Sequence, residues 1–180
     1  MPKTVTFSKD SKANSTFAID AKQVFLPERG MKVLDPAIGD FAGCTELDLS
    51  KNSLIELPDA LGELAALQKL NLTGNKGLKS LPSTLAKLKK LRKLEISRTA
   101  VATPPSVPAL EVLFADKNPS IDLEAVAAHT KLTNLQLSGC KLKALPTSFA
   151  GLTALKTLNL NENPLKPFPS IILELKALGR

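Results

Sequence analysis

The residue types that could carry catalysis are few in this chain, and their spacing does not bring them together. His129 is the only histidine, and Cys44 and Cys140 are the only cysteines. A histidine or thiol acts as a nucleophile or metal ligand only with partners in bonding range. His129 therefore fits a packed or half-exposed structural residue. Because P-loop, G-x-G-x-x-G and C-x-x-C motifs are also missing from the sequence, it predicts a protein that is not an enzyme, with no metal, cofactor or small-molecule substrate.

Charge is the more informative chemistry. Residues 76 to 98 hold eight basic residues and one acid, Glu95, so this basic block accounts for the whole formal charge of +7. It either keeps the protein soluble or docks an acidic partner, a phosphorylated segment or an anionic surface. Nucleic acid is disfavoured as a partner because the chain has no Tyr or Trp for base stacking. The basic block consists of Lys76, Lys79, Lys87, Lys89, Lys90, Arg92, Lys93 and Arg98.

The elements that position these residues follow from a repeat that is clearest over residues 132–165. It reads L-x-x-L-x-L-x-x-C/N-x-L and then L-P-x-x-F/L-x-x-L. Leu135 and Leu137 alternate with polar residues, so a short strand turns leucines inward and polar side chains outward. Stacking such units builds a parallel sheet with one row of polar side chains on its outer face.

The rest of each unit returns the chain to the next strand. Asn163 occupies the turn after a strand, where an amide side chain can bond backbone groups of neighbouring turns. Pro146 opens a segment in which Phe149 and Leu152 are spaced three residues apart, which favours a 3₁₀ or single α turn. The proline-rich stretch 104–108 favours an extended segment instead.

Residues 1–20 are polar and are expected to form a flexible lead-in, and residues 21–180 form the repeat domain. About seven units are predicted, starting near residues 21, 44, 67, 91, 110, 132 and 155. The first unit departs from the pattern, as a capping repeat does. The last convex segment points Leu178 toward a strand that the sequence does not contain. A partner or a second copy covers this residue, or the chain is a fragment of a longer protein.

The pattern resembles the leucine-rich repeat family, in particular the intracellular short "LP" type with repeats of about 23 residues. The resemblance covers residues 21 to 178. It implies an α/β solenoid, a right-handed curved horseshoe with a parallel concave sheet and short 3₁₀, α or extended convex segments. It also implies a protein-binding scaffold that takes part in signalling. Short intracellular members bind small GTPases, phosphatases or other regulators, and an acidic partner would match the basic block.

The phase of the repeat predicts which side chains line the concave face. Most are polar, but Val112 and Phe114 would expose an apolar pair with a charged rim, the usual make-up of a binding hot spot. A register slip at the proline-rich stretch would instead turn Phe114 inward. The predicted protein-binding residues are Glu46, Asp48, Lys69, Asn71, Lys93, Glu95, Arg98, Val112, Phe114, Asp116, Gln136 and Asn159.

Two further functions are compatible with this pattern. The repeats could be the recognition part of a larger enzyme of the ubiquitin-ligase or kinase type, or a structural subunit that uses the basic block. Cytoplasmic localisation is predicted because the N-terminus lacks a signal-peptide-like apolar region. The cysteines support it, since at about 5 Å per stacked unit Cys44 and Cys140 lie too far apart for a disulfide. No apolar run reaches the length of a membrane span.

Overall fold

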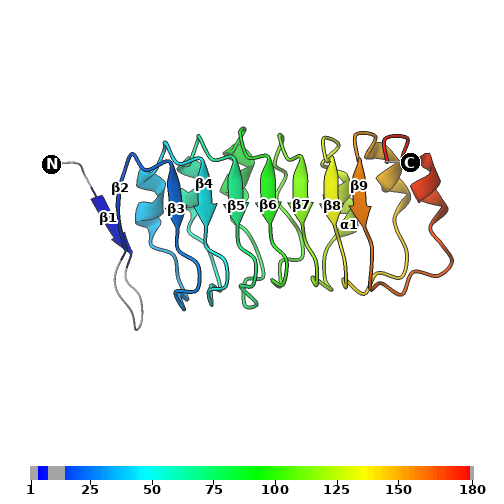
Figure 1. Ribbon diagram of the computed structural model, residues 1–180, viewed down its shortest axis with the longest axis horizontal. Helices are drawn as coiled ribbons and strands as arrows, with labels where there is room; N and C mark the ends of the chain where they lie inside the picture. Colours follow the sequence, from blue (N-terminus) through cyan, green and yellow to red (C-terminus); the bar gives the residue numbers. More distant parts are fainter. Residues whose placement is uncertain (1–3, 8–14, 179–180) are drawn as a thin grey trace.

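Seven short parallel strands form one sheet along the length of the molecule (Figure 1). The computed structural model describes residues 4–7 and 15–178. The sheet order follows the chain order, as expected when each repeat contacts only its neighbours. It confirms the predicted α/β solenoid of leucine-rich repeats. The strands are β3 (Gln23–Phe25), β4 (Glu46–Asp48), β5 (Lys69–Asn71), β6 (Lys93–Glu95), β7 (Val112–Phe114), β8 (Asn134–Gln136) and β9 (Thr157–Asn159).

The central residue of each strand points into the core. In β4 to β8 this residue is a leucine with almost no exposed surface, while its two neighbours are more exposed. Leu94 pairs with Leu113 although the unit between them is shorter than the others. The strand phase is therefore kept across the proline-rich stretch, because the inward leucines fix the register.

Asparagine side chains in the turns that follow the strands connect consecutive repeat units. Asn75 is fully buried, and its amide donates to the carbonyl oxygens of Leu49 and Leu72 at 3.0 and 2.8 Å. Its side-chain oxygen accepts from the Leu54 amide at 3.1 Å. Asn52, Asn118 and Asn163 make equivalent bonds. Buried turn groups are satisfied in this way, which confirms the role expected of the turn asparagines.

The opposite face carries single helical turns, several of which are drawn behind the sheet in Figure 1. Prolines in extended conformation precede several of them, and the Asp122 side chain caps α1 by accepting from the Glu124 and Ala125 amides. The described chain between η3 and α1 has no helical turn, as its prolines predict. The elements are η1 (Pro36–Asp40), η2 (Asp59–Glu63), η3 (Ser83–Lys87), α1 (Leu123–Ala127), η4 (Thr147–Gly151) and η5 (Ser170–Glu174).

An antiparallel pair of strands, β1 (Thr4–Phe7) and β2 (Ser15–Ala18), lies at the N-terminal end of the sheet (Figure 1). Phe7 is 3% exposed, and its ring stacks on Phe41 with centroids 5.9 Å apart. The Phe17 ring meets Phe7 edge-on at 6.3 Å. These strands were not predicted from the polar lead-in. Residues 1–3 and 8–14 of that lead-in lie outside the described residues, and its boundary at residue 20 and the unit starts stay predictions.

Candidate protein-binding surface

Strand pairing arranges the outward side chains of the sheet in two columns. Residues at the same position of successive strands pair directly, as Glu46 does with Lys69 and Asp48 with Asn71. The first column is Gln23, Glu46, Lys69, Lys93, Val112, Asn134 and Thr157. The second column is Phe25, Asp48, Asn71, Glu95, Phe114, Gln136 and Asn159. Ten of the twelve predicted binding residues belong to these columns, and Arg98 and Asp116 follow in the turns after β6 and β7.

The polar members of the columns bond sideways to one another. The Asn71 amide donates to Asp48 at 3.3 Å, and Lys69 Nζ lies 3.6 Å from a Glu46 oxygen. In the turns next to the columns, the Asp116 carboxylate accepts from the backbone amide of Ser138 at 2.8 Å. Such partly exposed pairs contribute little to folding stability. Their effect is to hold the polar side chains of this face in defined positions.

The middle of this surface is apolar. Val112 and Phe114 stand side by side in the two columns, and both are half-buried. Leu113 and Ala115 turn inward and are fully buried, so the alternative of a register slip is not found. Lys93 Nζ lies 4.8 Å from the centroid of the Phe114 ring and 2.7 Å from a Glu95 oxygen. A cation over an aromatic ring is a favourable contact, so Phe114 is partly covered by Lys93 rather than fully exposed.

The basic block does not form one patch. Lys87 belongs to η3 on the helical side and pairs with Glu63 at 3.1 Å. Arg92 pairs with Glu111, and Lys93 lies over the concave face. Lys79, Lys89 and Lys90 are exposed. Lys76 and Arg98 instead line a hollow together with Thr99 and Lys117. Lys117 belongs to the charged rim predicted around Val112 and Phe114 and lies outside the basic block, one repeat unit after Arg98.

His129, Cys44 and Cys140 are all buried and bond to backbone groups. His129 is buried, and its Nε2 lies 3.2 Å from the Val107 amide nitrogen and 3.0 Å from the Pro105 carbonyl oxygen. It therefore connects the chain just after α1 to the proline-rich stretch. The Cys44 thiol donates to the Glu46 carbonyl at 3.2 Å, and the Cys140 thiol donates to that of Ala115 at the same distance. Burial raises the pKa of both thiols. A raised pKa lowers the reactivity of a thiol at neutral pH.

Two features are absent from residues 4–7 and 15–178. These residues include no group of three or more His, Cys, Asp and Glu placed to hold a metal ion. They also include no helix with the length and apolar character needed to cross a membrane.

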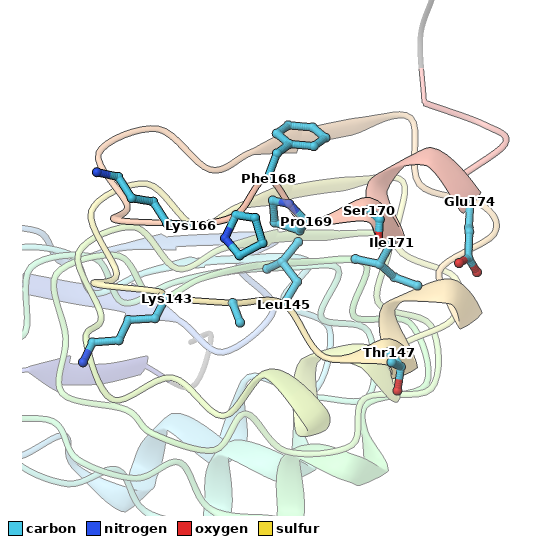
Figure 2. A pocket seen from close by; sticks show the side chains of 11 residues that line it. Lys143, Leu145, Thr147, Lys166, Phe168, Pro169, Ser170, Ile171 and Glu174 are labelled. Carbon is cyan, nitrogen blue, oxygen red and sulfur yellow. The ribbon is translucent and has the colours of Figure 1, made fainter.

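A second apolar area lies at the C-terminal end. A hollow of about 260 Å³ lies between η4 and η5. Figure 2 shows Leu145 and Ile171 in its wall and Glu174 at one end. Phe168 lines the same hollow and is 69% exposed. None of these residues was predicted as a site, because the repeat pattern gives the convex apolar positions a core role.

Comparison with known proteins agrees with this architecture. A family described as "Leucine rich repeat" matches residues 43–101, and one described as "Leucine Rich repeats (2 copies)" matches residues 130–172. The X-ray radiation resistance-associated protein 1 of Mus musculus is 35% identical over 152 residues, which are 82% of this chain. The chain spans only 16% of the length of that relative.

Solved structures show the same fold. A leucine-rich repeat protein of Leptospira interrogans is 32% identical, with a TM-score of 0.68 over 89% of this chain and 48% of its own. The plant peptide hormone receptor RGFR1, solved in complex with RGF2, is 25% identical, with a TM-score of 0.68 over 89% of this chain and 28% of its own. The stacked strands, the turn asparagines and these matches show that the chain belongs to the leucine-rich repeat family, whose members are generally protein-interaction modules and typically non-catalytic scaffolds.

Proposed function

We propose that this protein is a non-catalytic interaction module that binds a partner protein on the concave face, centred on Phe114. The observation that carries the proposal is the apolar pair of Val112 and Phe114 in the middle of an otherwise mostly polar surface. Exposed apolar groups surrounded by polar ones are typical of interface hot spots. Here the sheet holds the pair in place, which lowers the conformational entropy lost on binding.

The surroundings of Phe114 favour a partner with an apolar anchor and acidic groups. Lys93 and Lys69 lie beside the apolar pair in the first column. A carboxylate of the partner would replace Glu95 as the ion-pair partner of Lys93. An apolar side chain of the partner would then pack on the Phe114 ring, which Lys93 covers in the free protein. Opposite charges across an interface mainly speed association and select the partner. Small GTPases and phosphatase-type regulators, which the family resemblance suggests, are the first partners to test.

The two thiols support a cytoplasmic location. Cys44 and Cys140 are both free and buried in separate units. Extracellular proteins usually oxidise their cysteines to disulfides, whereas the cytoplasm keeps thiols reduced.

The test compares two matched variants, Phe114→Ala and Phe168→Ala. Each variant is immobilised and incubated with native extract, and the retained partner protein is measured. Phe168 is an exposed phenylalanine outside the concave face. We expect Phe114→Ala to lower the free energy of unfolding by about 1 kcal/mol and to weaken partner binding by about 2 kcal/mol or more. Phe168→Ala should retain the partner. Equal retention by both variants, or a loss of about 3–5 kcal/mol of stability for Phe114→Ala, would contradict the proposal.

Salt dependence checks the acidic character of the partner. Raising the salt past about 0.15 M, where the screening length is about 8 Å, should slow association if charges steer it. A partner whose association rate is unaffected by salt would bind through the apolar pair alone.

A further inference from the structure

Three cations from successive turns surround one hollow at the edge of the sheet. Lys76, Arg98 and Lys117 lie in the turns that follow β5, β6 and β7, and together with Thr99 they line an open space of about 430 Å³. All three charged side chains are exposed. Neither Lys76 nor Lys117 is on the strand surface, so the hollow is distinct from the Phe114 centre.

The hollow lies beside a row of equivalent turn residues, one from each repeat unit. The residue before each turn asparagine, or its replacement, has a left-handed backbone, so these residues occupy equivalent positions along the same edge. Gly74, with φ +83°, stands directly before Arg98 in this row and has no side chain. Lys76 comes from the same turn as Gly74. The row is Glu28, Lys51, Gly74, Arg98, Lys117, Gly139 and Glu162.

The charges at the hollow are poorly compensated within the chain. At the N-terminal end of the row, Lys51 pairs with Glu28 at 2.7 Å. Across residues 4–7 and 15–178, Lys76 and Arg98 take part in no ion pair, and Lys117 reaches only Glu162, at 4.0 Å. Like charges gathered around a concavity concentrate the local field and attract anions.

We propose that Lys76, Arg98 and Lys117 bind the phosphate group of a phosphorylated side chain in a partner protein. A phosphate monoester carries nearly two negative charges at neutral pH and several acceptor oxygens, which matches three cations lining one space better than a single carboxylate does. The Arg98 guanidinium can bond two phosphate oxygens at once, and the lysines act as point charges.

The arrangement fits one phosphate group rather than a polyanion. Three other cations of the basic block, Lys87, Arg92 and Lys93, pair with acids, which leaves less free positive charge to follow a nucleic-acid backbone. The inference goes beyond the concave-face proposal, because this hollow can hold a phosphate whether or not Phe114 contacts a partner.

The direct test is an amide NMR titration of the chain with the peptide acetyl-Gly-phosphoSer-Gly-amide, at about pH 7.5, where the phosphate is mainly dianionic. The unphosphorylated peptide is the control for the ligand. We expect saturable shifts at residues 74–76, 97–99 and 116–118 with the phosphorylated peptide only. Shifts spread over the surface, or no saturation, would overturn the proposal. Tighter binding to phosphatidylserine vesicles or to a mixed-sequence DNA duplex than to the phosphopeptide would also overturn it.

Two triple variants that lose the same number of charges distinguish phosphate binding in the hollow from attraction to the overall positive charge of the protein. Lys76→Gln/Arg98→Gln/Lys117→Gln removes the three lining charges, and Lys87→Gln/Lys89→Gln/Lys90→Gln removes three charges elsewhere. We expect the first to weaken phosphopeptide binding about tenfold or more and the second less than about twofold. Equal weakening would assign the binding to net charge. If the first variant fails to fold, Lys76→Glu against Lys79→Glu makes the same comparison at two exposed positions.

Discussion

The two ends of the solenoid follow the same repeat pattern but are packed differently. At the N-terminal end, the β1–β2 pair covers the first repeat, and Phe7 stacks on Phe41 in the core. At the C-terminal end, Leu158 in β9 is only half-buried, whereas Leu135 at the same position of β8 is fully buried. Leu173 in η5 is 80% exposed.

The helical turns are also packed more closely near the N-terminal end than near the C-terminal end. A Cβ added to Gly62 in η2 would lie 2.5 Å from the Thr84 Cβ, so the glycine permits η2 and η3 to pack closely. A Cβ added to Gly151 in η4 would meet nothing within 4 Å. In a repeat protein each unit is stabilised mainly by its neighbours. Leucine spacing therefore determines the fold, while the packing between neighbouring units determines how stable each unit is.

The largest expected effect comes from the two phenylalanines at opposite ends. Phe7→Ala should lower the free energy of unfolding by about 3–5 kcal/mol, because it removes a buried ring between two aromatic neighbours. Phe168→Ala removes a mostly exposed ring and should change stability by no more than about 0.5 kcal/mol. Urea melts of the two variants measure the difference. Similar losses would mean that the strands of residues 4–7 and 15–18 do not cap the core.

Equivalent strand leucines give the next test. Leu135→Ala should cost about 2–5 kcal/mol of unfolding free energy, because the cavity is fully enclosed. Leu158→Ala should cost about half as much, since part of its side chain already meets water. Gln136→Ala, one residue on and facing outward, should stay within about 0.5 kcal/mol. A loss at Gln136 as large as that at Leu135 would contradict the strand phase.

The helical packing is tested with added methyl groups. Gly62→Ala should destabilise by about 1–3 kcal/mol, because η2 or η3 must shift to make room. Gly151→Ala should be neutral within about 0.5 kcal/mol. Thermal melts suffice for this pair, and an unaffected Gly62→Ala protein would show that the two turns are not closely packed.

The smallest expected effect is a difference in reactivity between the two thiols, which report on local opening of the units that contain Cys44 and Cys140. Cys140→Ala leaves only Cys44, and Cys44→Ala leaves only Cys140. Both thiols are buried and react through local opening. We expect Cys140 to react several-fold faster with a disulfide reagent, because its unit is nearer the loosely packed end. Faster reaction of Cys44 would reverse the proposed order of local stability.

The same thiols predict how stability depends on pH. Burial raises their pKa in the folded protein, so folding favours the protonated thiols. This contribution is fully present below the pKa of an unfolded thiol, about 8.5, and is lost as the pH rises through the higher folded pKa. Stability should therefore fall above about pH 8.5, and less so in a Cys44→Ala/Cys140→Ala protein.

Most of the solenoid could be predicted because its core positions recur. Leu135 and Leu137 predict the strand phase, and Asn163 predicts the turn after the strand. The prolines of residues 104–108 predict the extended segment. What could not be predicted depends on contacts between residues far apart in sequence. The β1–β2 pair depends on Phe7 meeting Phe41, which a polar lead-in does not suggest.

The candidate site was predictable in position but not in detail. The column positions of Val112 and Phe114 follow from the repeat phase. The placement of Lys93 over Phe114 does not, because a long side chain can take many rotamers. The basic block separates because its members lie on different faces: Lys87 is in η3 and pairs with Glu63, whereas Lys93 lies over Phe114 on the concave face. The binding role of the predicted residues stays a prediction.

The most direct measurement places a photocrosslinking side chain at each of the two apolar areas. Phe114→p-benzoylphenylalanine probes the concave centre, and Phe168→p-benzoylphenylalanine probes the C-terminal hollow. With the partner that the unmodified chain retains, irradiation should give a covalent adduct from position 114 and little or none from position 168. Adduct formation from position 168 alone would contradict binding on the concave face and move the interaction to the loosely packed end.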